Sequence, residues 1–137
     1  MKTDSHKEQL VVVTGGAGFI GSHLVERLLA EHKRVVVVDD LSTGNRSNLA
    51  GVESNPRFQF IHSAVSACKE LPQLVREAES VYHLAAAVGV ELVVRSPIHV
   101  LRTNLQETEI LLEAASEQRT PVLIASTSEV YGKSQKE

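Results

Sequence analysis

The chain has 137 residues, 42% of them hydrophobic, which is enough to bury a core as one domain. A formal net charge of −3, no Trp and only two Tyr and three Phe argue against nucleic acid as a partner. One cysteine excludes an intrachain disulfide, and no apolar run approaches the roughly eighteen residues of a membrane span. We expect a polar lead over residues 1–9 without a signal peptide, and a cytoplasmic domain over residues 10–137 with no membrane partner.

The first predicted elements are a strand, a glycine-rich turn and a helix. The apolar run Leu10–Val13 predicts the strand, and apolar residues recur at helical spacing over about Gly18–Glu31. Gly15 permits the sharp turn, Gly18 lets the backbone approach a pyrophosphate, and Gly21 lets the helix pack closely on the strand. The helix would point its unpaired N–H groups and positive dipole end at the phosphates. In this context, the glycines favour a dinucleotide site over a purely structural turn.

The second predicted strand supplies the acid that such a site requires. Arg34–Asp39 is apolar without alternation, as in a parallel strand covered on both faces, and it ends on Asp39 about twenty residues after the glycines. A carboxylate there can accept hydrogen bonds from both ribose hydroxyls, whereas Asp39 and Asp40 together would repel the 2′-phosphate of NADP. We therefore expect NAD. Arg46 keeps NADP open as an alternative, and Asp40 alternatively only solvates the loop.

The remaining predicted elements continue the alternation of strands and helices. We expect a strand at Phe58–Ile61, a helix at Lys69–Glu79, a strand at Ser80–Leu84, a longer connection at Val88–Arg95, a long helix at Pro97–Gln118 capped by Ser96, and a strand at Pro121–Ala125. This alternation predicts an α/β, Rossmann-type fold: a doubly wound parallel sheet of five strands in the order 3-2-1-4-5. The six histidines lack metal-ligand spacing, so we expect no metal site.

Two hydroxyl residues and an acid, Thr127, Ser128 and Glu129, follow the last strand beside the switch point of the sheet, where a doubly wound fold places its catalytic groups. The motifs shared with a known family are TGGAGFIGSHL at residues 14–24, VVDDLSTG at 37–44, HLAA at 83–86, Thr103-Asn104, and STSEVYG at 126–132. With these motifs, the sequence resembles the extended short-chain dehydrogenase/reductase family of nucleotide-sugar epimerases, dehydratases and decarboxylases. The resemblance implies NAD-dependent oxidation of a sugar hydroxyl that Thr127 hydrogen-bonds. It also matches Ser128 and Glu129 to the acid that dehydratases and decarboxylases use after that oxidation.

The residues expected to contact the dinucleotide lie in the glycine turn, in the loops after the strands and in the long helix. They are Gly15, Ala17, Gly18, Phe19, Ile20, Gly21, Asp39, Asp40, Leu41, Ser42, Thr43, Gly44, Ala64, Val65, Leu84, Ala85, Ala86, Ala87 and Asn104. The small side chains of Ala85, Ala86 and Ala87 either let backbone approach the cofactor or simply pack. Asn104 is either a brace between elements or an ordinary exposed residue.

Some positions depart from the family pattern. Four residues after Tyr82 is Ala86 and four after Tyr131 is Gln135, so neither tyrosine begins the Tyr-x-x-x-Lys motif that supplies the base. Ala64 stands where many relatives have an aspartate that reaches the adenine amino group, and Glu107 replaces a common glycine of the long helix. We expect the N-terminal part of such an enzyme, acting above all on a UDP-sugar, truncated before the later strands and the substrate region, and inactive alone. The alternative is a non-catalytic, NAD-binding module that acts by regulation or partner contact.

The long helix carries two apolar stripes, which is more than one sheet contact needs. Ile98, Leu101, Leu105, Thr108, Leu112 and Ala115 form the stripe expected to be covered, and Val100, Ile110, Leu111 and Ala114 form the stripe expected to be exposed. The strand at Pro121–Ala125 would also offer an apolar edge with unpaired backbone groups. We therefore expect a homo-oligomer, formed through the second stripe or through the strand edge.

Overall fold

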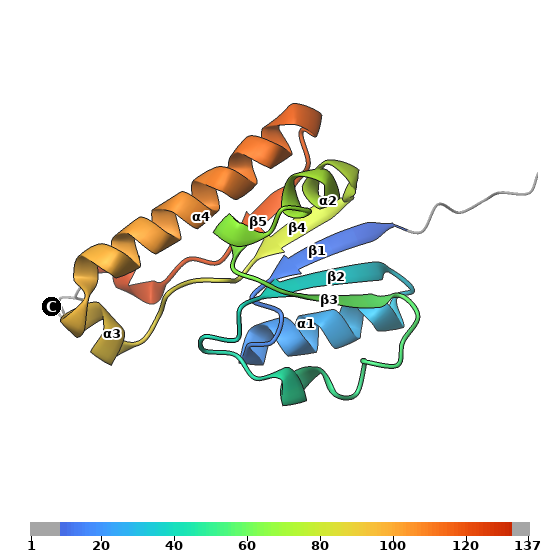
Figure 1. The fold of residues 1–137 in the computed structure, drawn as a ribbon, viewed down its shortest axis with the longest axis horizontal. Coiled ribbons are helices and arrows are strands. Elements are labelled where there is room, and N and C mark those ends of the chain that lie inside the picture. The colour runs from blue at the N-terminus through green and yellow to red at the C-terminus, as the bar shows by residue number, and fades with distance from the viewer. Residues whose placement is uncertain (1–8, 133–137) are drawn as a thin grey trace, which may run out of the picture.

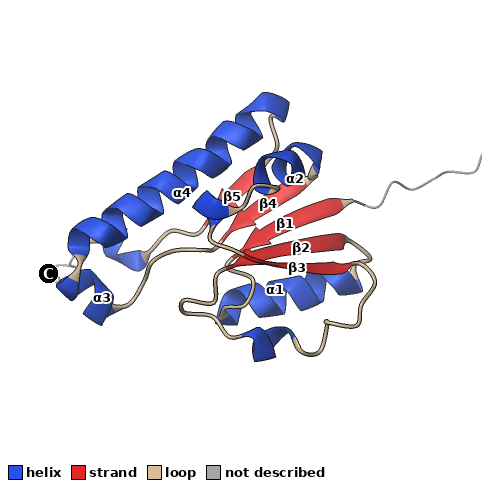
Figure 2. Cartoon of the chain, in the orientation of Figure 1, coloured by secondary structure: helices blue, strands red, loops and turns tan. Residues whose placement is uncertain are grey.

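The computed structural model describes residues 9–132, which form a parallel sheet covered by helices on both faces (Figures 1 and 2). The elements are β1 Leu10–Thr14, α1 Phe19–Ala30, β2 Arg34–Asp39, β3 Phe58–His62, α2 Leu71–Glu77, β4 Ser80–His83, α3 Val90–Arg95, α4 Pro97–Gln118 and β5 Val122–Ile124. Short 3-10 helices lie at Arg46–Leu49, Val65–Ala67 and Ser128–Tyr131. The strand order is β3-β2-β1-β4-β5, which confirms the predicted doubly wound fold.

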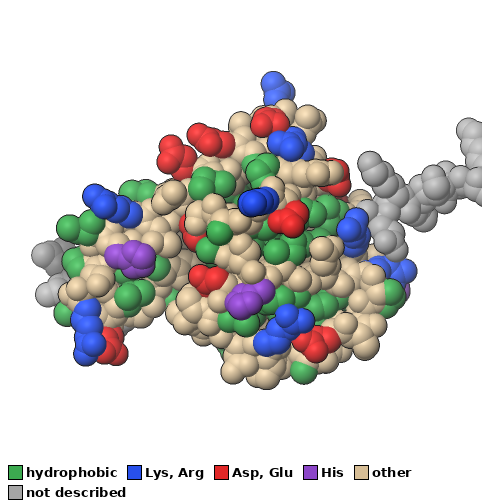
Figure 3. All heavy atoms as spheres, viewed as in Figure 1, with side chains coloured by type: hydrophobic (Ala, Val, Ile, Leu, Met, Phe, Trp, Pro, Cys, Tyr) green, Lys and Arg blue, Asp and Glu red, His purple; other side chains and the backbone are tan. Residues whose placement is uncertain are grey.

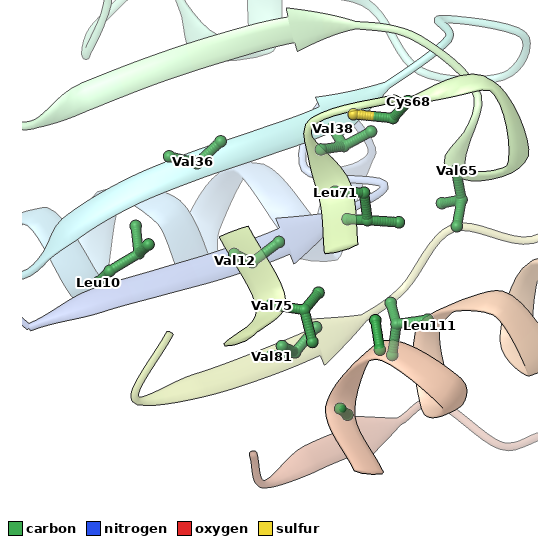
Figure 4. Close-up of a cluster of buried hydrophobic side chains, with 12 residues drawn as sticks. Leu10, Val12, Val36, Val38, Val65, Cys68, Leu71, Val75, Val81 and Leu111 are labelled. Atoms are coloured by element: carbon green, nitrogen blue, oxygen red, sulfur yellow. The ribbon is translucent and has the colours of Figure 1, made fainter. Parts of the chain in front are cut away.

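The consecutive valines of β1 and β2 divide between two cores because neighbouring residues of a strand point to opposite faces. One set packs under α2 and α4 with Leu71, Val75 and Leu111 (Figure 4): Leu10, Val12, Val36, Val38 and Val81. The alternate set packs against α1, with Val25, Leu28 and Leu29: Val11, Val13, Val35 and Val37. Burial on both faces explains why neither strand alternates with polar residues, as is typical of central parallel strands.

Two local expectations are wrong. The connection at Val88–Arg95, for which no helix was predicted, contains the helix α3, which packs on α4 beyond the carboxyl ends of the strands (Figure 1). Ser96 separates α3 from α4, but its side chain makes no capping hydrogen bond, and Pro97 opens α4 without it. Among residues 9–132, no helix is long and apolar enough to cross a membrane.

The covered and exposed faces of α4 are the reverse of those predicted. Val100, Leu111 and Ala114, expected to be exposed, are 8%, 0% and 5% exposed, because this face meets α2 and the 3-10 helix at Val65–Ala67. The stripe expected to be covered is open to solvent over most of its length, at Ile98, Leu101, Leu105 and Leu112. Only its last member, Ala115, lies in the core. The stripe of Val100, Ile110, Leu111 and Ala114 therefore packs against the core, and the prediction that it is exposed for association is wrong.

Candidate functional site

A cavity of about 780 Å³ lies at the carboxyl ends of the strands, where the loops after β1, β2, β3 and β4 meet. It is the position at which an open α/β sheet binds ligands. Most of the residues predicted to contact a dinucleotide line it: Gly15, Gly18, Phe19, Ile20, Gly21, Asp39, Asp40, Ser42, Thr43, Gly44, Ala64, Val65, Leu84, Ala85, Ala86 and Ala87. Ile20 of α1 is 69% exposed and lines this cavity.

The three glycines of the turn have different surroundings. Gly15 has a φ of +71°, and a Cβ there would lie 2.6 Å from the backbone nitrogen of Ala85. A Cβ at Gly21 would overlap the carbonyl oxygen of Gly15 and lie 2.7 Å from the Cα of Gly16. Gly18 has φ −76° and ψ 177°, and a Cβ there would meet only the oxygen of Gly15, at 3.3 Å. Gly15 and Gly21 are thus required by the fold, whereas the open side of Gly18 faces the cavity.

Asp39 is fixed beneath the glycine turn by backbone hydrogen bonds. The N–H of Ala17 donates to its Oδ2 at 2.9 Å, and the N–H of Leu41 donates to its Oδ1 at 2.8 Å. Leu41 has a φ of +61°, which is unusual for a residue other than glycine. Ala17 and Leu41, both predicted to contact the dinucleotide, do not line the cavity; their backbone N–H groups hold the carboxylate of Asp39 in place. The carboxylate is 7% exposed and keeps lone pairs for hydroxyl donors in the cavity.

The loop after β2 places negative charge at the cavity. Asp40 accepts a hydrogen bond from the N–H of Ser42 at 2.9 Å, and hydrogen bonds from Ser42 lower the pKa of this carboxyl. Arg46 points elsewhere: its guanidinium lies 4.1 Å from the ring centre of Phe60, and its Nε lies 2.7 Å from Oε1 of Glu53. No Lys or Arg of the described residues lines the cavity. The site therefore offers acceptors for hydroxyls and no cation for a 2′-phosphate.

A buried hydrogen-bonded chain holds the start of the loop after β4. Thr14 Oγ1 lies 2.7 Å from Nδ1 of His83, and Thr108 Oγ1 lies 3.1 Å from Nε2 of the same ring. The N–H of Ala85 also donates to Thr14 Oγ1, at 3.2 Å. Burial lowers the pKa of His83 and so favours the neutral form of the ring. His83 is a hydrogen-bonded structural residue that joins β1, β4 and α4.

Asn104 holds the end of the same loop from α4. Its Oδ1 accepts from the N–H of Ala87 at 2.7 Å, and its Nδ2 donates to the carbonyl of Ala87 at 3.2 Å. Of the two roles considered for Asn104, the geometry shows the brace; the side chain does not line the cavity. Its contribution to a ligand is made through the Ala85–Ala87 backbone, which it positions.

The residues predicted to carry chemistry lie at the same edge of the sheet. Ala125, directly after β5, lines the cavity, and Thr127 follows two residues later, exposed and outside the lining. Ser128 and Glu129 begin the last 3-10 helix, and their side chains lie outside the part of the chain that the structure describes. Thr127 thus lies two residues after a lining residue but is not itself part of the cavity wall.

Several lining residues were not predicted. Three of them, His99, Thr103 and Glu107, recur every fourth residue along α4, and the others are Val38, Ser63, Val88, Leu92 and Ala125. The signal that could have found the three is their i, i+4, i+8 spacing, which puts polar side chains on one face of a helix. Glu107 is 8% exposed, and burial raises the pKa of its carboxyl against hydrogen bonds from Ser66 and the Val65 backbone.

Comparison with known proteins gives the family. Residues 12–137 match the family model described as GDP-mannose 4,6 dehydratase. UDP-glucuronic acid decarboxylase 1 of Arabidopsis thaliana is 38% identical over 126 residues, which are 92% of this chain and 28% of that protein.

Solved structures agree. DesIV, a dTDP-glucose 4,6-dehydratase from Streptomyces venezuelae with NAD and TYD bound, has a TM-score of 0.85 at 36% identity, over 94% of this chain and 42% of that one. A UDP-N-acetylglucosamine 4-epimerase from Methanobrevibacter ruminantium has a TM-score of 0.85 at 32% identity, over 94% and 41%. The chain thus spans well under half of the proteins it matches. It belongs to the extended short-chain dehydrogenase/reductase family of nucleotide-sugar enzymes, with the fold of their N-terminal part.

Proposed function

We propose that this chain is the NAD-binding portion of a nucleotide-sugar epimerase, dehydratase or decarboxylase. The observation that carries the proposal is the cavity at the strand ends, in which the open side of Gly18 and the buried carboxylate of Asp39 lie together. The relatives support it, since one matched dehydratase has NAD bound and the matched curated proteins include UDP-glucuronic acid decarboxylases.

The residues present fit a dinucleotide. The backbone at Gly18 and the first N–H groups of α1 would hold the pyrophosphate, because these donors lack partners within the helix and the dipole favours an anion. Asp39 would accept hydrogen bonds from ribose hydroxyls. The Ala85–Ala87 backbone, positioned by Asn104, would border the nicotinamide half. When bound, NAD supplies the hydride acceptor for oxidation of a sugar hydroxyl.

A titration with NAD and with NADP tests this cofactor role. We expect the wild-type chain to bind NAD more tightly, and Asp39→Ala to weaken NAD binding by about 1 to 3 kcal/mol, as lost hydrogen bonds to a charged group typically do. Arg46→Ala is the matched control for the NADP alternative: because Arg46 stacks on Phe60 and pairs with Glu53, both affinities should stay unchanged. Tighter binding of NADP, lost in Arg46→Ala, would contradict the assignment.

The sugar side of the reaction is proposed for the loop after β5. Thr127 would hydrogen-bond the hydroxyl that is oxidised, and Ser128 with Glu129 would act on the oxidised sugar, above all a UDP-sugar. A positioned base typically contributes about 10² to 10⁴ in rate, and no residue of this sequence matches the family base. We therefore expect the 137-residue chain to bind NAD without converting UDP-glucuronate. Product formation that is abolished in Thr127→Ala would show that this chain completes the site itself.

We also propose that the chain self-associates through the exposed stripe of α4, which replaces the face first expected. Ile98, Leu101 and Leu105 are 65%, 62% and 69% exposed, and Leu123 and Ile124 of β5 are 53% and 44% exposed. Figure 3 shows hydrophobic side chains open to solvent at the end of the molecule formed by α3 and the start of α4. Several large apolar side chains exposed along one helix face favour an interface there.

A further inference from the structure

Glu107 is a buried acidic residue in the wall of the candidate cavity. It lies midway along α4 with 8% of its surface exposed, and it lines the same cavity as Asp39. Acidic side chains are almost never buried to this extent unless they are paired. No Lys or Arg of the described residues lines this cavity to neutralise it. Its known partners are neutral hydrogen-bond donors, Ser66 and the backbone of Val65.

The order of the strands gives the part of the cavity that Glu107 occupies. The loops that follow β1, β2 and β3 lie side by side, since these strands are neighbours in the sheet. They carry, in that order, the glycine turn, Asp39, and the pair Ala64 and Val65. A dinucleotide with its pyrophosphate at the turn and its ribose at Asp39 therefore extends its base toward Ala64 and Val65. Glu107 reaches this third position from α4.

A base at this position presents an edge of hydrogen-bonding groups to the wall. Ala64 has no side-chain acceptor, and the apolar neighbours Val38 and Val65 offer none either. A carboxylate has about four lone-pair sites, so the bonds from Ser66 and Val65 leave acceptor capacity for a donor in the cavity. The same bonds fix the carboxyl group in orientation, and burial strengthens a hydrogen bond made there.

We propose that Glu107 recognises the adenine of the bound dinucleotide by accepting a hydrogen bond from its exocyclic amino group. This inference rests on the proposed function, because it requires a dinucleotide in the cavity. It makes Glu107 a specificity-determining residue: the carboxylate attracts the amino group of adenine and repels the carbonyl oxygen that hypoxanthine carries at the same position. The competing role is structural, in which Glu107 only holds the Val65–Ala67 turn against α4.

The test compares NAD with nicotinamide hypoxanthine dinucleotide, in which a carbonyl oxygen replaces the amino group and the adjacent ring nitrogen N1 carries a proton. We expect wild type to bind NAD at least about tenfold more tightly, the range of a hydrogen bond to a charged acceptor. Glu107→Gln should bring the two affinities close together, because the amide can donate to the carbonyl oxygen of hypoxanthine while still accepting elsewhere. Glu109→Gln is the matched control: Glu109 is exposed on the same helix and outside the cavity, so the preference should remain.

Equal weakening of both dinucleotides in Glu107→Gln, with the wild-type preference kept, would assign Glu107 to the structural role and overturn the proposal. No preference in wild type, with clear binding of both, would overturn it as well while leaving the NAD site intact. Wild type that binds neither dinucleotide would refute the proposed function and this inference together. Urea unfolding of each variant shows whether a loss of binding reflects a loss of folded protein.

Discussion

Replacing Gly18 and Gly21 by alanine, one at a time, should separate ligand binding from folding. At Gly21 the added methyl group meets backbone atoms, the oxygen of Gly15 and the Cα of Gly16 at 2.7 Å, which cannot rotate away. Overpacking of this kind costs about 1 to 3 kcal/mol, and the better helix propensity of alanine returns about 0.5 to 1 kcal/mol. The difference leaves a net loss of up to about 2.5 kcal/mol, and because the contacts are with backbone atoms we expect Gly21→Ala to lower the free energy of unfolding by about 1 to 2.5 kcal/mol.

Gly18→Ala has a different balance. Its φ of −76° and ψ of 177° suit alanine, so the lower entropy of the unfolded chain stabilises by about 0.4 to 1 kcal/mol. The 3.3 Å approach to the Gly15 oxygen opposes this gain, and the net change in stability should stay within about 0.5 kcal/mol of zero. The methyl group occupies the space that a pyrophosphate needs, however, so NAD affinity should fall about tenfold or more.

Urea unfolding and NAD titration on the two variants measure both effects. Gly18→Ala that binds NAD like wild type would show that no phosphate approaches this backbone, and the placement of the cofactor would be wrong. Gly21→Ala with wild-type stability would refute the close approach of α1 to the turn.

Two further predictions concern pH and association. Burial lowers the pKa of His83 below its usual 6.5, so between the two pKa values the unfolded chain binds a proton that the folded chain does not. The free energy of unfolding therefore falls as the pH drops from 6.5 to the folded-state pKa of His83, and this group causes no loss of stability above pH 6.5. The free energy of unfolding, measured in urea at pH 7.5 and 5.5, should change less with pH in His83→Gln than in wild type. An equal change in both proteins would show that His83 does not cause the pH dependence. Leu105→Glu should abolish self-association in light scattering without loss of folding, because Leu105 is exposed, whereas Leu111→Glu should unfold the chain, because Leu111 is fully buried; a wild-type chain that remains monomeric at micromolar concentration would refute this surface.

The fold could be predicted because its strongest signals are local. The valine runs, the glycine turn and Asp39 each depend on neighbours in the sequence, and the alternation of strands and helices then permits few topologies. Gly18 and Asp39, which were predicted from such local signals, both line the same cavity. The helix α3 was missed because Val90–Arg95 has only six residues, too few to show a period, and its contact with α4 is long-range information.

The orientation of α4 could not be decided from periodicity, since both of its stripes are apolar. One of them, with Val100, Leu111 and Ala114, also contains Glu107, and a charged residue in a stripe indicates solvent by the usual pattern. In the structure this stripe faces the core and the cavity, and the acid is tolerated there because Ser66 and Val65 donate to it. Glu107, whose charge indicated a solvent-exposed face, is also the residue for which we propose a role in the site. Departures from local sequence rules are expected at functional positions.

The two faces of α4 thus carry separate proposed tasks that one rotation of the helix fixes together. Glu107 stands seven residues after Val100 and four before Leu111, so packing those two residues in the core necessarily turns Glu107 to the same side. Leu101 and Leu105 are then turned to solvent. An adenine contact by Glu107 and self-association through Leu105 therefore do not compete for surface. Association of the chain should leave the base preference unchanged, since it adds no group to the cavity side of the helix.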